Sequence, residues 1–160
     1  MSEQSQWNIP KSRYDRLAGW LGGAFLAVAA FYLWANWPAI PEKIPTHYGF
    51  RGQPDAWGNK SSCVMVLAVG AILWGLVRLV EQFPVIWNTG VPVTEENQKR
   101  VYRTLKSMLV SLRLALAVVF AWLAVWSAQA RPLGVWFLPL TLLLVLGPMT
   151  FFLVRLYRGR

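Results

Sequence analysis

Residues 17–34 read LAGWLGGAFLAVAAFYLW, a run that contains no charged residue. An α-helix rises about 1.5 Å per residue, so this run nearly spans a hydrocarbon core of about 30 Å. Comparable runs cover residues 61–79, 109–128 and 133–156. None carries a charge at its centre, where a charged side chain would cost about 2.5–3.5 kcal/mol on insertion. The sequence therefore predicts an all-α membrane protein with four transmembrane helices in a single membrane domain, residues 1–160.

The composition favours the same class. Apolar residues make up 56% of the chain, and Asp, Glu, Lys and Arg only 14%. The alternative, a soluble four-helix bundle, would need a more polar surface. A net charge of +9 is compatible with nucleic-acid binding, but the basic residues flank the apolar runs instead of lining one face, which argues against a nucleic-acid partner. The single cysteine, Cys63, excludes an intrachain disulfide and a cysteine-based zinc site.

Basic residues beside the runs predict the orientation. On one side of the predicted membrane, beside the runs or just inside their ends, lie Lys11, Arg13, Arg16, Arg78, Lys99, Arg100, Arg103, Lys106, Arg113, Arg155, Arg158 and Arg160. The other side holds only Lys43, Arg51, Lys60 and Arg131. The positive-inside rule then places both termini in the cytoplasm. A cleaved signal peptide is the alternative for the first run, but the run is longer than a typical signal-peptide core.

Small residues within the runs predict where helices approach closely. Gly19, Gly23 and Ala27 follow one another at a spacing of four, and Gly70 and Gly75 suggest a similar contact in the second run. In the fourth run, Pro148 is expected to kink the helix because proline removes a backbone hydrogen bond. Pro139 is a second candidate for such a kink.

Residues 36–60 form the predicted outer loop. Three prolines favour extended backbone in its first part, and its glycines allow turns. Tyr48, Phe50 and Trp57 are apolar enough to dock onto the helix ends. We expect a compact, irregular loop that caps the bundle.

Two motifs in this loop resemble a known family. Ile44-Pro-Thr-His-Tyr48 and Gly52-Gln-Pro-Asp-Ala-Trp-Gly-Asn-Lys60 are similar to the signature of the domain-of-unknown-function family that forms the N-terminal part of SdpI-type immunity proteins. The resemblance implies a bacterial cytoplasmic membrane protein, associated with protection from a secreted peptide toxin and with signalling about it. Candidate ligand-binding or cap-stabilising residues are Pro45, His47, Gly52, Asp55, Trp57, Asn59 and Lys60.

A second resemblance lies in the predicted cytoplasmic loop, residues 82–106. Asn88 to Val93 followed by Thr-Glu-Glu-Asn is similar to the family's turn and helix start, which singles out Asn88, Pro92, Thr94, Glu95, Glu96 and Asn97. Thr94 is a suitable N-cap, and the two glutamates complement the helix dipole. We therefore expect a helix that begins here and runs into the third span.

Chemistry at the outer loop has three interpretations. Asp55 could orient His47 as a general base, but no serine or threonine nearby lies in a recognisable nucleophile motif. His47 and Asp55, with Glu42, are weak metal candidates because zinc usually needs at least three well-placed ligands. In the third interpretation Asp55 caps a turn, His47 bonds loop backbone and Lys60 anchors the cap at the headgroups. No cofactor is expected.

Three functional hypotheses follow. The first is a module that recognises, or protects against, an extracytoplasmic peptide ligand. The second is an accessory subunit that packs against another membrane protein, such as a transporter or sensor. The third is a membrane enzyme that uses His47 and Asp55. The lipid bilayer is the common partner, and a homo-oligomer is compatible with each. A transporter is disfavoured because no acidic residue lies mid-span.

Overall fold

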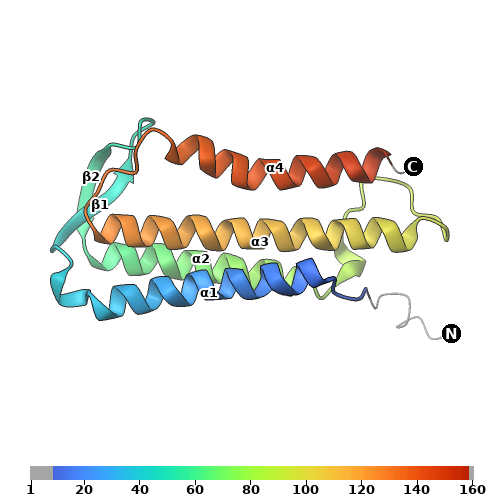
Figure 1. Ribbon diagram of the computed structural model, residues 1–160, viewed down its shortest axis with the longest axis horizontal. Coiled ribbons are helices and arrows are strands. Elements are labelled where there is room, and N and C mark those ends of the chain that lie inside the picture. Colours follow the sequence, from blue (N-terminus) through green and yellow to red (C-terminus); the bar gives the residue numbers. More distant parts are fainter. Residues whose placement is uncertain (1–8, 159–160) are drawn as a thin grey trace.

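The computed structural model describes residues 9–158, which form a bundle of four helices with a small sheet at one end (Figure 1). The helices are α1 (Arg13–Ala35), α2 (Ser61–Val80), α3 (Gln98–Ala128) and α4 (Phe137–Arg158). All four are long and apolar enough to cross a membrane. Large side chains such as Trp20 and Phe31 face outward, 81% and 65% exposed. An apolar outer surface suits lipid, so the prediction of an all-α, multi-pass membrane protein is confirmed.

Helix α3 forms the centre of the bundle. Helices α1 and α2 pack on one side of it and α4 packs along another (Figure 1). Ala117, Ala121, Ala124 and Ala128 form a buried row on α3 that contacts Leu26, Leu33, Cys63 and Leu67. Small side chains let helices approach closely, which favours association where lipid gives no hydrophobic driving force. Within the described residues, Leu156 is the only buried side chain of α4.

Glycine contacts between helices agree only in part with the prediction. Cβ atoms added at Gly19 and Gly22 would come within 2.6 Å of Arg113 Nη2 and 2.7 Å of Trp74 Nε1, whereas Ala27 is exposed. A Cβ at Gly23 would lie 3.7 Å from Trp74, so the predicted face makes contact at Gly19 and Gly23 but not at Ala27. The buried stripe of α1 instead advances by three or four residues through Ala18, Gly22, Leu26, Ala29 and Leu33. Gly70 abuts Phe120, but nothing lies within 4 Å of a Cβ at Gly75.

The connection between α1 and α2 is more regular than predicted. After a short 3₁₀ helix (Trp37–Ala39), β1 (Lys43–Tyr48) and β2 (Pro54–Asn59) pair as an antiparallel hairpin, with irregular register around His47. We call this unit the hairpin. The tight turn uses Gly52 at φ +72°, and Gly52 N–H donates to Gly49 O. Prolines concealed the strand pattern from sequence reasoning, since proline is usually confined to edges and irregular positions of a sheet.

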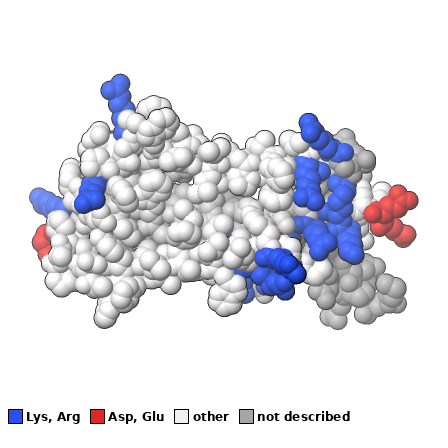
Figure 2. All heavy atoms as spheres, viewed as in Figure 1, with Lys and Arg blue, Asp and Glu red and all other residues white. Residues whose placement is uncertain are grey.

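The opposite end of the bundle holds the second connection, with a 3₁₀ helix at Pro84–Ile86. Helix α3 begins at Gln98, so the expectation that Glu95 and Glu96 occupy its first turn was wrong. Thr94 and Asn97 instead close a separate turn, in which each backbone N–H donates to the other's side-chain oxygen. Lys and Arg side chains gather at this end, which we call the basic end (Figure 2).

The two prolines of the fourth run differ in position. Pro139 lies in the first turn of α4, where a missing N–H removes no helix bond, so the structure gives no reason for a kink there. Pro148 lies inside the helix, as expected. The helix starts at Phe137 and not at Leu133, because Gly134 at φ +77° turns the chain first and accepts a hydrogen bond from Phe137 N–H.

Candidate functional site

The hairpin is fixed to the bundle through backbone contacts. Pro45 is buried, and its carbonyl accepts a hydrogen bond from Ser127 Oγ. Leu133 N–H donates to Gly52 O over 2.9 Å, and a Cβ at Gly52 would overlap the backbone of Gly134. The turn of the hairpin is therefore held against the α3–α4 connection. Because the turn is anchored, β2 is held in one preformed arrangement.

Aromatic residues of the hairpin divide into two groups. Tyr48 is half-buried and its hydroxyl donates to Arg131 O over 3.3 Å, while burial raises the pKa of this hydroxyl. Phe50 and Trp57 are 86% and 54% exposed, so the expectation that they dock onto the helix ends was wrong. Their exposure leaves these two rings available to a partner.

His47 and Asp55 meet across the two strands. Nδ1 of His47 lies 2.6 Å from Oδ1 of Asp55, and their side chains are 70% and 50% exposed. This contact agrees with the first interpretation of the loop, in which Asp55 orients His47, whereas the third interpretation expected His47 to bond loop backbone. Across residues 9–158, no three His, Cys, Asp or Glu side chains lie close enough to hold a metal ion. Glu42, the third weak metal candidate, bonds elsewhere.

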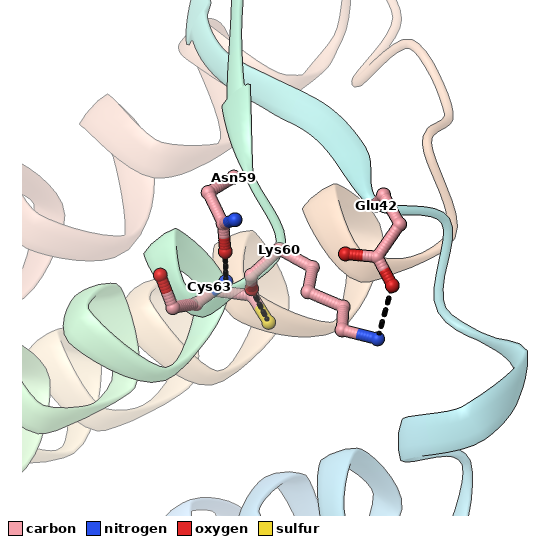
Figure 3. Close-up of polar contacts among 5 residues, drawn as sticks. Glu42, Asn59, Lys60 and Cys63 are labelled. Carbon is pink, nitrogen blue, oxygen red and sulfur yellow. Dashed lines mark hydrogen bonds and ion pairs between the residues drawn. The ribbon is translucent and has the colours of Figure 1, made fainter.

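Asn59 and Lys60 join the hairpin to α2 (Figure 3). The side-chain oxygen of Asn59 accepts a hydrogen bond from Ser61 N–H at 2.9 Å, at the first residue of α2. Lys60 Nζ lies 2.8 Å from Glu42 Oε1 and over the Trp37 ring, 5.1 Å from its centroid. Lys60 O also accepts a bond from the Cys63 thiol. These contacts indicate a role in connecting the elements rather than in contacting a ligand.

The second motif forms a folded loop at the basic end. Asn88 Oδ1 accepts a hydrogen bond from Gly90 N–H, and Asn97 Nδ2 donates to Pro92 O, each at 3.0 Å. Val91 is buried against Leu156 and two residues of α3. Thr94, Glu95 and Glu96 are exposed. The motif therefore docks the connection onto α3 and α4 and leaves its acidic residues facing outward.

Sequence reasoning missed a charged centre inside the basic end. Arg113 and Glu81 are only 2% and 7% exposed, and Arg113 Nε lies 3.2 Å from Glu81 Oε1. Burial raises the pKa of Glu81, and the Arg113 guanidinium partly offsets this rise. The Arg113 guanidinium also lies 5.1 Å from the Trp74 ring centroid. A cavity of about 310 Å³ adjoins the pair and is also lined by Asp15 and Lys106.

Hydroxyl groups extend this charged centre toward α1. Asp15 is buried, accepts a hydrogen bond from Ser107 Oγ at 2.9 Å, and forms a capping box with Ser12 at the start of α1. Tyr14 and Ser111 hydroxyls lie 2.6 Å apart. Helices α1 and α3 are therefore joined by polar contacts at the basic end and by small apolar side chains elsewhere.

Comparison with known proteins gives one match. Residues 24–69 match the model of a family described as a domain of unknown function, DUF1648. The matched segment runs from within α1 through the hairpin into α2. It includes every hairpin residue that the sequence analysis singled out. Neither the curated proteins nor the solved structures give a match.

Proposed function

We propose that this membrane protein recognises an extracytoplasmic peptide through the hairpin, as an SdpI-like immunity or signalling module of a bacterial cytoplasmic membrane. In this proposal the basic end faces the cytoplasm, together with both termini. The motif resemblance and the family match over residues 24–69 support it, since both centre on the hairpin. The basic side chains at the opposite end of the bundle support the orientation.

The free edge of β2 is the observation that carries the proposal. Within residues 9–158 the sheet has two strands, and the backbone groups on the outer edge of β2 bond to no third strand. An exposed strand edge can pair with an extended peptide through main-chain hydrogen bonds. Trp57 projects from the middle of β2, and Phe50 lies in the adjoining turn. Exposed aromatic rings can add side-chain specificity to that pairing.

The His47–Asp55 pair gives the same surface a polar contact. Both side chains are exposed, so each can form a hydrogen bond with a peptide donor or acceptor in addition to, or in place of, the bond between them. Asp55 is the only hydrogen-bond partner of the His47 side chain among the described residues. Because that bond involves neither hydroxyl nor thiol, binding has stronger support here than nucleophilic catalysis.

We expect Trp57→Ala and Asp55→Ala to weaken peptide binding about tenfold or more, since exposed aromatic and charged groups commonly dominate such contacts. Peptides selected from a random extended library on the protein in nanodiscs supply the probe, and their dissociation constants are then measured for each variant. The matched control is Trp20→Ala, an exposed tryptophan on α1. Two results would contradict the proposal and leave the hairpin with a structural role only. One is unchanged peptide affinity in both hairpin variants at normal abundance of the protein, and the other is loss of the folded protein in both.

A further inference from the structure

A cavity at the basic end lies between α1, α3 and α4. It measures about 630 Å³. Its cations are Arg100 and Arg103 of α3 and Arg155 of α4, and its apolar wall is formed by Pro148, Phe151 and Phe152. Neither the hairpin nor the Arg113–Glu81 pair contributes to it. The cavity is therefore separate from the proposed peptide surface.

The lining of this cavity carries three cations. No aspartate or glutamate is among the described residues that line it. Arg100 Nη1 makes one long bond, 3.5 Å to Leu156 O, and Arg100 Nη2 is buried without a hydrogen-bond partner among residues 9–158. A buried donor without a partner is costly. Guanidinium groups bind phosphate oxygens in paired, charge-assisted hydrogen bonds, so the missing partner has the properties of a phosphate.

The apolar wall indicates the kind of phosphate. Phe151 and Phe152 stack edge to face, with ring centroids 5.1 Å apart, and Phe151 is 59% exposed. They belong to α4, whose apolar face is largely open to lipid. A free phosphate ion would make no use of such a wall, whereas a phospholipid places its acyl chains beside its phosphate. The basic end is also where spans meet the headgroup layer.

We propose that this cavity binds the phosphate of an anionic phospholipid, with the three arginines around the headgroup and the chains along Phe151 and Phe152. The neighbouring cavity beside Arg113 is a weaker candidate because Glu81 and Asp15 already balance part of its positive charge. The proposal depends on the protein's being embedded in a membrane and not on peptide recognition. Binding of lipid here would fix α4, which packs chiefly on α3, to the rest of the bundle.

The test uses the full chain in nanodiscs of zwitterionic lipid that contain a small fraction of phosphatidylglycerol. Native mass spectrometry after gentle release counts the phosphatidylglycerol retained on each protein. We expect one retained molecule, and we expect Arg155→Gln and Arg103→Gln each to lower the affinity about fivefold. Both side chains are exposed, so folding should survive either substitution. The matched control is Lys99→Gln, an exposed cation of α3 outside this cavity.

Soluble ligands separate a lipid site from a simple anion site. Inorganic phosphate and glycerol phosphate, added in excess, are expected to displace little of the retained phosphatidylglycerol, and Phe151→Ala is expected to increase its loss. Displacement by either soluble anion at millimolar concentration would overturn the lipid assignment. An equal decrease in retention for Lys99→Gln and the two arginine variants would show non-specific surface attraction and overturn the site.

Discussion

Replacement of Glu81 by leucine is expected to lower the free energy of unfolding by about 3–5 kcal/mol, because it leaves the buried Arg113 guanidinium without its anionic partner. Arginine stays charged in proteins and cannot relieve the burial by losing its proton. Arg113→Met is expected to cost less. Burial already raises the pKa of Glu81, so a carboxyl left alone can take up a proton and become neutral.

The double variant Glu81→Leu with Arg113→Met distinguishes this account from simple loss of packing. Replacing both members of a buried ion pair by apolar side chains is often neutral or stabilising. We therefore expect the double variant to be more stable than Glu81→Leu alone when unfolding is followed in detergent by denaturant titration. Additive losses in the double variant would mean that the two side chains do not interact.

Gly70→Ala is expected to produce the second large effect, a loss of about 1–3 kcal/mol from overpacking. A Cβ at Gly70 would overlap Cβ of Phe120, an atom next to the backbone of α3 that cannot move aside alone. Helices α2 and α3 must then separate along the buried row of alanines. The same unfolding titration in detergent measures the loss.

Gly75 provides a matched control five residues further along α2. Nothing lies within 4 Å of a Cβ at this position, so Gly75→Ala adds only helix propensity. We expect a gain of about 0.4–1 kcal/mol. If both alanine variants changed stability by the same amount and in the same direction, the close approach of α2 and α3 at Gly70 would be contradicted.

The four helices were predictable because each span is specified by about twenty successive residues, whose transfer preferences add. The packing of the helices depends on smaller differences, between neighbouring faces of one helix. The stripe through Gly22 and Ala29 differs from one through Gly23 and Ala27 by a rotation of about 100°, and α1 is apolar around most of its circumference. Hydropathy therefore predicted the four helices, whereas contacts with neighbouring side chains determine which face of α1 is buried.

The hairpin shows a different limit. Its motif singled out His47 and Asp55, and their pairing was one of three interpretations that the sequence left open. His47 and Asp55 face each other because the strands pair with an irregular register, which no residue in the motif specifies alone. Phe50 and Trp57 were expected to dock because they are apolar, yet side-chain type does not tell which face of a strand meets the bundle.

The Arg113–Glu81 pair was not predicted from the sequence for a third reason. Glu81 and Arg113 are far apart in sequence and meet only through the packing of α2 on α3. One signal was available: Arg113 lies inside an apolar run, and Glu81 is the acidic residue directly after the preceding one. An ionisable residue inside a span usually has a partner. That rule would have suggested the pair before the structure did.

Thiol labelling in intact cells tests the central claim, a four-span protein with its hairpin outside and its basic end in the cytoplasm. Cys63 is the only cysteine and is buried, so Cys63→Ala gives a background for single cysteines. We predict that Trp57→Cys reacts with a membrane-impermeant maleimide in intact cells and Glu95→Cys only after permeabilisation. Labelling of Glu95→Cys alone, or of both, in intact cells would contradict the account.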